Sequence, residues 1–314
     1  MAASTVALTG ATGFVGGAIA RHLSAQGFEL RLLARRPAAL PALSGDHAIV
    51  RGALDERDKL DELLSGAEMV VHTAGLIKAL DEREFMAVNR DGAAAVAESA
   101  RKAGARRFVL ISSIAARSPL LSSYAASKRA GEAAVVERLG SEASIIRPPV
   151  VYGPGDRETL PMFRAARLGY FPVPGPPEAR LSFIHVADLA AAVAASLASP
   201  AVPTGIFEID DGTAGGYGWP EIGDALGVAF GRTPRPVPLS APLLRIAAGV
   251  ALLFARMSGR PMMLRPDKVN ELRHPDWVCR DSNFSQLTRW HGQFDLHAGF
   301  CDAVAWYRAQ GMLK

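Results

Sequence analysis

The amino-acid sequence predicts an α/β fold, in which a doubly wound parallel sheet is followed by a smaller, mostly helical lobe. In the first half, short apolar or β-branched runs alternate with alanine-rich stretches of helical spacing, as repeated βαβ units require. In the second half this alternation stops, and Pro- and Gly-rich loops separate isolated strands from helices. The 314 residues, 49% hydrophobic and 21% charged, suit one large or two modest domains with a sizeable core.

The alternation assigns elements in chain order. In the first half it predicts strands at Thr5–Thr9, Glu29–Ala34, Met69–Thr73, Arg107–Ser112 and Ser144–Arg147, and helices at Phe14–Gln26, Lys59–Leu64, Glu84–Ala103 and Tyr124–Leu139. The second half is expected to hold strands at Leu181–Val186 and Ile206–Ile209, helices at Trp219–Leu226 and Leu243–Met257, and loops at Gly153–Asp156, Phe171–Pro177 and Ser199–Gly205. We therefore expect a first domain over residues 1–150 and a second lobe over 151–314, with segments near 181–209 returning to the large domain.

Composition narrows the class of protein. The net charge of +4 is spread along the chain without a run of five like charges, which argues against a nucleic-acid partner. Two cysteines, Cys279 and Cys301, offer neither metal-ligand spacing nor a disulfide framework, so we expect no metal and a reducing cytoplasm. The start of the chain lacks a basic region, and the apolar run Ile246–Ala255 is too short to span a bilayer. A soluble cytoplasmic protein without an integral membrane span is expected.

A glycine pattern lies between the first predicted strand and the first predicted helix. Gly10, Gly13 and Gly16 are spaced G-x-x-G-x-x-G, with Thr12, Phe14 and Val15 between and around them. A dinucleotide pyrophosphate binds bare backbone amides at a helix N-terminus, where a Cβ would block its approach. Glycines alone could form an ordinary turn, but the strand before and the helix after are the context that this mechanism needs. The loop predicts a Rossmann-type, dinucleotide-binding first domain.

The end of the second predicted strand indicates which nicotinamide cofactor fits. An acidic residue there would accept a hydrogen bond from the ribose 2′-hydroxyl, but the sequence carries Arg35 and Arg36 instead. Two guanidiniums suit the 2′-phosphate, so NADP is preferred over NAD, although the arginines could also be solvated surface residues. Other cofactor contacts are expected from Leu54 and Asp55 near adenine and from the small residues Thr73, Ala74 and Gly75, which could equally form a turn.

A tyrosine and a lysine open the predicted helix that begins at Tyr124. Tyr124 and Lys128 are four residues apart and therefore share one helix face. A phenol with a pKa of about 10 is a poor acid or base at neutral pH, so we expect a nearby ammonium and a positively charged nicotinamide to lower its pKa. A serine hydroxyl could hold the substrate oxygen beside the phenol, and Ser112-Ser113 ends a strand of the same sheet.

With these motifs in this order, the sequence resembles the extended short-chain dehydrogenase/reductase family of NAD(P)-dependent epimerases, dehydratases and reductases. The resemblance covers nearly the whole chain and includes three segments: Thr9 to Gly16, Arg147 to Gly155 and Phe183 to Leu189. It implies a catalytic set of Ser113, Tyr124 and Lys128, with Lys128 also holding the nicotinamide ribose. It also implies that Pro148 and Val151 lie near the nicotinamide ring, and that Asn89 organises the backbone around the site.

The sequence departs from the family pattern in two places. The gap between Ser113 and Tyr124 is short for an extended member, which leaves Ser112 as an alternative active-site serine. Many sugar-nucleotide epimerases place an arginine four residues before the histidine here numbered His185, to hold the substrate diphosphate. That position is Leu181, and Arg180 one residue earlier would point to the other face of a strand.

Three functions remain open from the sequence. The first is an oxidoreductase that transfers hydride between the nicotinamide and a small-molecule carbonyl or alcohol substrate. The second is a sugar-nucleotide epimerase or dehydratase that recycles NAD, and the third is a catalytically idle, cofactor-binding regulatory or assembly protein. The apolar stretch from Leu243 to Phe254, with Met257, Met262 and Met263, could line a substrate pocket or pack in the core, and Leu243 to Phe254 could also touch a membrane surface. A homodimer through the two long helices is possible.

Overall fold

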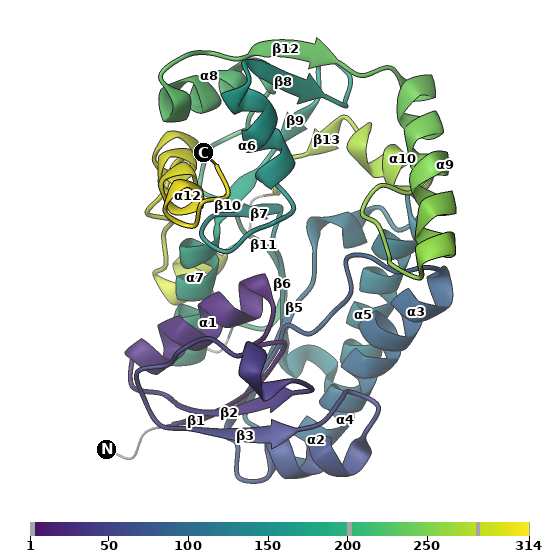
Figure 1. The fold of residues 1–314 in the computed structure, drawn as a ribbon. Coiled ribbons are helices and arrows are strands. Elements are labelled where there is room, and N and C mark those ends of the chain that lie inside the picture. Colours follow the sequence, from purple (N-terminus) through teal and green to yellow (C-terminus); the bar gives the residue numbers. More distant parts are fainter. Residues whose placement is uncertain (1–3, 200–202, 281–282, 314) are drawn as a thin grey trace.

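A computed structural model describes residues 4–199, 203–280 and 283–313 (Figure 1). Residues 1–3 are not among the described residues, and neither are residues 200–202, which belong to the loop predicted at Ser199–Gly205. Over the described residues, a seven-stranded parallel sheet forms the centre of the larger lobe. Its strands, in spatial order, are β11 (Gly205–Glu208), β6 (Ala143–Arg147), β5 (Arg107–Ile111), β4 (Met69–His72), β1 (Thr5–Thr9), β2 (Glu29–Ala34) and β3 (His47–Arg51).

Helices cover both faces of this sheet, because successive side chains of a strand point to opposite faces. Within β1, Val6 and Leu8 belong to one apolar cluster and Ala7 to another. On the first face lie α1 (Phe14–Ala25) and α7 (Val186–Ala198), which pack against each other. On the second face lie α2 (Arg57–Leu64), α4 (Ala93–Ala103) and α5 (Ser123–Leu139). Strands buried on both faces explain the near-continuous apolar runs in the sequence.

The strand order reverses between β1 and β4. Chain segments leaving the carboxyl ends of these two neighbours run to opposite sides, which opens a crevice at that edge of the sheet. Thr73, directly after β4, donates a hydrogen bond from its hydroxyl to the Thr9 carbonyl at 2.7 Å and so fastens the two strand ends together. The predicted fold class, a Rossmann-type α/β sheet with a helical C-terminal part, is confirmed.

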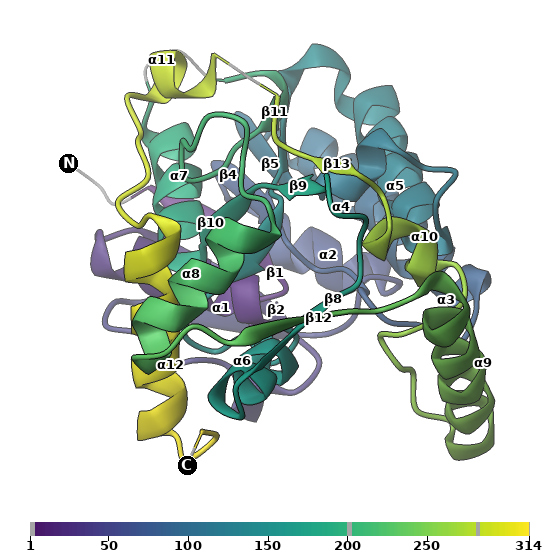
Figure 2. The same cartoon turned by 90° about the horizontal axis from the view of Figure 1, so that it is seen from above.

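The smaller lobe lies beyond the carboxyl edge of the sheet (Figures 1 and 2). Its core is aromatic, with edge-to-face contacts around Phe300 from Tyr152, Phe163 and Phe183. It is built from α6 (Leu160–Arg167), α8 (Trp219–Phe230), α12 (Leu296–Ala309) and the strand pairs β7 (Val150–Tyr152) with β10 (Phe183–His185), β8 (Tyr170–Val173) with β12 (Arg235–Pro238), and β9 (Arg180–Leu181) with β13 (Asp276–Trp277). On its other side lie α9 (Ala241–Ser258) and α10 (Lys268–Leu272), while α11 (Phe284–Thr288) contacts α7.

Three predicted elements differ from the structure. The long helix Glu84–Ala103 is α3 (Glu82–Met86), a π-helical segment Ala87–Gly92, and α4. The strand Leu181–Val186 is broken at Ser182 into β9 and β10, because Leu181 pairs with Tyr217 and the Ser182 amide donates to the Trp277 carbonyl. Phe171–Pro177, predicted as a loop, contributes to β8, which tolerates proline because it has one partner strand, β12.

Candidate active site

The glycine loop turns between β1 and α1. Gly10 has φ +83°, and a Cβ on Gly10 or Gly16 would overlap the Thr73 hydroxyl, so close packing requires both glycines. Gly13 differs, because its φ of −90° suits any residue and a Cβ would meet only the Gly10 carbonyl oxygen at 3.3 Å. Gly13 is exposed, caps α1 without a side-chain hydrogen bond, and is followed by a first turn without carboxylates. Bare amides and a free positive helix end fit a dinucleotide pyrophosphate.

The other residues predicted to contact a cofactor border the same edge of the sheet. Thr12 is exposed, and Phe14 and Val15 are half-buried at the start of α1. Arg35 and Arg36 are exposed directly after β2, and neither guanidinium makes a hydrogen bond or ion pair with another described residue. Most of the remaining predicted contacts also follow strand ends: Leu54, Asp55, Thr73, Ala74, Gly75 and Pro148. Val151 differs, because it lies within β7.

Tyr124 lies in the first turn of α5, and Ser122 caps that helix by accepting a hydrogen bond from the Ala125 amide at 3.0 Å. The hydroxyl of Ser113, two residues after β5, lies close enough to the Tyr124 phenol to favour its ionised form, and the Ala115 amide donates to the same serine oxygen at 3.2 Å. Burial has the larger effect and raises the pKa of Tyr124 to about 12. In the protein by itself the phenol therefore holds its proton. The expected lowering, which also requires a positively charged nicotinamide, stays a prediction.

Lys128 lies one turn further along α5. Its ammonium donates a hydrogen bond to the Ile111 carbonyl at 2.8 Å, and its Nζ is 3.8 Å from the place that a Cβ on Gly75 would take. Burial lowers the pKa of Lys128 to about 8, and the charge of Lys128 together with burial lowers that of His72 to about 3. His72 accordingly serves as a neutral structural partner of the Thr9 hydroxyl, at 2.6 Å.

The lowered pKa of Lys128 predicts a pH-dependent stability. Below about pH 8 the lysine is protonated both in the folded and in the unfolded chain, whereas between about 8 and 10.4 the unfolded chain binds one more proton. The free energy of unfolding should therefore rise by about 1.4 kcal/mol per pH unit in this window, relative to Lys128→Met. Urea unfolding of both proteins across the window measures the difference. A constant difference would contradict a buried lysine of low pKa.

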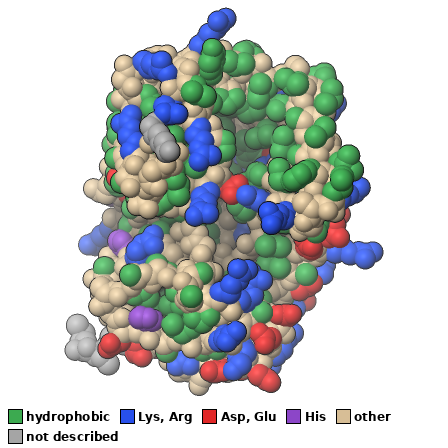
Figure 3. All heavy atoms as spheres, viewed as in Figure 1, with side chains coloured by type: hydrophobic (Ala, Val, Ile, Leu, Met, Phe, Trp, Pro, Cys, Tyr) green, Lys and Arg blue, Asp and Glu red, His purple; other side chains and the backbone are tan. Residues whose placement is uncertain are grey.

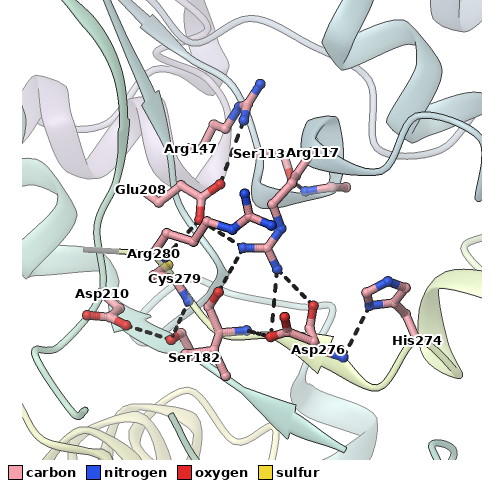
Figure 4. A network of polar contacts seen from close by, with 12 residues as sticks. Ser113, Arg117, Arg147, Ser182, Glu208, Asp210, His274, Asp276, Cys279 and Arg280 are labelled. Carbon is pink, nitrogen blue, oxygen red and sulfur yellow. Dashed lines mark hydrogen bonds and ion pairs between the residues drawn. The ribbon is translucent and has the colours of Figure 1, made fainter. Parts of the chain in front are cut away.

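Ser112, the alternative active-site serine, is held elsewhere. It is buried and donates a 2.5 Å hydrogen bond to Glu132, which also receives a two-point ion pair from Arg147 at 2.8 and 2.6 Å. Figure 4 shows how the network continues from Arg147 through Glu208 to Arg117, beside Ser113. Of the two serines, Ser113 is the one whose hydroxyl affects the pKa of Tyr124, whereas the Ser112 hydroxyl is bonded to Glu132.

The π-helical segment fixes the backbone next to the site. Asn89 sits in it, accepts a hydrogen bond from the Leu76 amide at 2.7 Å and donates to the Leu76 carbonyl and the Ser127 hydroxyl, both at 2.9 Å. A π-turn of this kind is often found at functional sites, because it re-aims a side chain within a helix. Asn89 thus ties the chain after β4 to α5 between Tyr124 and Lys128.

Three residues at the site, Arg265, Lys268 and Glu271, were not predicted as site residues, and they lie there with Met263, for which pocket lining was one of the open interpretations. Met263, Arg265, Lys268 and Glu271 line a small pocket with Tyr124, and the Lys268 ammonium lies 5.1 Å from the centre of the Tyr124 ring. Glu271 accepts hydrogen bonds from Ser122 and Lys268, which fastens α10 to the start of α5. The sequence signal is weak: Asp267 before a short apolar stretch predicts a helix start, but nothing relates it to a tyrosine so distant in the chain.

Comparison with known proteins agrees with this arrangement. The model of the NAD dependent epimerase/dehydratase family matches residues 6–209. A ceramide reductase of Caulobacter vibrioides is 41% identical over 99% of this chain and 97% of its own length, and a sterol demethylase protein B of Methylococcus capsulatus is 29% identical over 98% and 100%. The Bordetella bronchiseptica enzyme WbmG, solved with NAD and UDP, has the same fold at a TM-score of 0.73 and 22% identity, covering 98% of this chain and 96% of that one.

The family match covers well over half of the chain. It includes the glycine loop, the Tyr124–Lys128 pair and β11. The curated relative covers the smaller lobe as well. The expected resemblance is confirmed: this chain is an enzyme of the extended short-chain dehydrogenase/reductase type and belongs to the NAD dependent epimerase/dehydratase family.

Proposed function

We propose that this enzyme is an NADP-preferring reductase that converts an apolar carbonyl substrate into an alcohol. The observation that carries the proposal is the placement of Ser113 beside a protonated Tyr124, with the buried Lys128 one helical turn away on the same helix. Reduced nicotinamide would supply the hydride when bound. Tyr124 gives its phenolic proton to the carbonyl oxygen, Ser113 holds that oxygen, and Lys128 stabilises the phenolate and orients the ribose.

The protonation state of Tyr124 supports the reducing direction. A general acid must hold its proton before the reaction, and burial keeps this phenol protonated at neutral pH. The charge of Lys128 then has its largest effect as the phenolate forms, because a buried charge is poorly screened. The name of the 41% identical relative, a ceramide reductase, agrees with reduction and with a lipid substrate.

The apolar cluster that includes Tyr124 supports an apolar substrate, although Arg265, Lys268 and Glu271 also line the pocket beside the ring. Leu181, at the position where an epimerase arginine would stand, packs with Tyr124 and Trp277 in one apolar cluster. The neighbouring Arg180 is already engaged, since its guanidinium donates to the Gly215 and Gly216 carbonyls at 2.6 Å each. A nucleotide-sugar diphosphate would lack its cation here, so the epimerase or dehydratase alternative is less well supported by these contacts.

A substrate panel tests the proposal. The purified enzyme should oxidise NADPH in the presence of apolar or lipid ketones, followed by NADPH absorbance and by detection of the alcohol product. Conversion of UDP- or dTDP-sugars without net cofactor consumption would instead support the epimerase alternative. Cofactor binding without turnover of any carbonyl, alcohol or nucleotide sugar would support a regulatory protein.

Arg35 and Arg36 provide the test of cofactor preference. Replacing both by alanine should weaken NADPH binding by about tenfold to a hundredfold, because hydrogen bonds to a charged phosphate contribute about 1.5–3 kcal/mol, and should leave NADH binding nearly unchanged. Fluorescence titration with both cofactors measures the effect. Arg101→Ala, at an exposed ion pair of α4, is the matched control. If the native protein binds NADH as tightly as NADPH, Arg35 and Arg36 are solvated surface residues and do not select the cofactor.

A further inference from the structure

We propose that α9 is an interfacial helix that docks this enzyme on the surface of an anionic lipid membrane. This inference goes beyond the proposed function and does not depend on it. Its basis is a surface that we call the α9 face, made of exposed apolar side chains on the outer side of the helix: Leu243, Ile246, Val250, Leu253, Phe254 and Met257.

The α9 helix has two apolar faces. At about 100° per residue, Leu244, Ala248 and Ala255 share one side, which is buried against the protein together with Val269 of α10. The α9 face lies on the opposite side within an arc of about 100°, and its side chains are 54% to 80% exposed. The buried side packs against the rest of the protein, so the α9 face is available to contact a membrane or another apolar surface.

In the whole molecule, the α9 face is not covered by other described elements. Figure 2 shows α9 standing at the margin of the molecule, and Figure 3 shows hydrophobic side chains gathered over it. Among the helices of the described residues, α9 is long and apolar enough to be tested as a membrane span, with a mean hydropathy of 1.4, yet only 17% of it is buried. A core helix of such hydropathy would be mostly buried.

Charge favours an anionic lipid surface as the occupant. Residues 225–266 contain no aspartate or glutamate and six arginines: Arg232, Arg235, Arg245, Arg256, Arg260 and Arg265. Arg245 and Arg256 project from α9 about 120° from the centre of the α9 face, where they can reach lipid phosphates while the apolar side chains enter the membrane. An apolar face bordered by arginines is typical of helices that lie in the membrane interface.

The geometry argues for lying on the membrane and against crossing it. At 1.5 Å per residue, the 18 residues of α9 span about 27 Å, slightly short of a hydrocarbon core of about 30 Å. The buried side of α9 also stays attached to Leu239, Leu264 and Val269. The chain then passes Met263, in the pocket beside Tyr124, so the docked face and the candidate active site belong to neighbouring parts of one segment.

Vesicle flotation of the full chain tests the proposal. Native protein should float with vesicles of phosphatidylcholine plus phosphatidylglycerol, and less with phosphatidylcholine alone or in high salt. The double variant Ile246→Gln/Leu253→Gln should bind at least about tenfold more weakly, since each side chain loses apolar area buried in the membrane. The variant Arg245→Gln/Arg256→Gln should lose chiefly the preference for anionic vesicles.

The matched control is Leu168→Gln/Val228→Gln, which removes two comparably exposed apolar side chains on α8 and at the end of α6. It should leave flotation unchanged, and circular dichroism should show both double variants folded. Absence of native protein from the vesicle fraction, or equal loss in both double variants, would overturn the proposal. So would a dimer in sedimentation that Ile246→Gln/Leu253→Gln converts to a monomer without any vesicle binding.

Discussion

Replacing Tyr124 by phenylalanine should lower kcat for carbonyl reduction by about a hundredfold to ten-thousandfold, the usual contribution of a positioned general acid. The variant keeps the ring that packs against Phe85 at 6.0 Å between centroids and removes only the hydroxyl beside Ser113. Cofactor binding, measured by NADPH fluorescence, should change little. Steady-state rates on the best ketone of the substrate panel give the effect.

Tyr170→Phe is the control for this variant, because the Tyr170 side chain is 55% exposed on β8, away from α5. It should retain the native rate. A Tyr124→Phe protein that reduces ketones at the native rate would remove Tyr124 from the proposed mechanism. A variant that has lost NADPH binding as well would point to a structural role of the hydroxyl in the cofactor site.

The second large effect is expected on stability. Glu132 is buried on α5, and Glu132→Ala would leave the Arg147 guanidinium without its two-point partner and the Ser112 hydroxyl without an acceptor. Removing one partner of a buried ion pair costs about 3–5 kcal/mol, because the other charge stays in a poorly solvating environment. We expect the free energy of unfolding in urea to fall by this amount.

Two variants separate the ion pair from general sensitivity of α5. Glu137→Ala removes an exposed carboxylate from the same helix, beside Arg138, and should change stability by less than about 0.5 kcal/mol. Glu132→Gln retains a hydrogen-bond acceptor and should be intermediate, which keeps a measurable variant if Glu132→Ala does not fold. Equal stability of Glu132→Ala and Glu137→Ala would show that the buried pair contributes no net stability.

The sequence predicts the first half of the fold well, because it repeats one local rule. Most strands of the sheet are apolar runs and the covering helices show helical spacing, so periodicity alone finds β1, α1 and α5 within one or two residues. No range is predicted for the edge strand β3, because four of its five residues are exposed and it is not an apolar run. In the smaller lobe the strands have two to four residues and pair with partners far along the chain. Such short segments carry too little periodicity to be recognised.

The candidate site shows the same division. Gly10, Tyr124 and Lys128 can be located from the sequence because each belongs to a local pattern: a turn between strand and helix, or a pair four residues apart. Lys268 and Glu271 cannot be, since they reach Tyr124 only through tertiary packing of α10. The protonation state of Tyr124 in the protein by itself also depends on burial by distant segments, which no local pattern in the sequence predicts.

The edge strand β11 pairs with a strand that lies far before it in the sequence, and this separation bears on the order of folding. It pairs with β6, so the chain must close a loop over residues 148–204, including much of the smaller lobe, before the last strand enters the sheet. The loss of chain entropy precedes the gain from that pairing, and a high contact order slows folding. We therefore expect β11 to join the sheet after the strands whose partners are closer in the sequence.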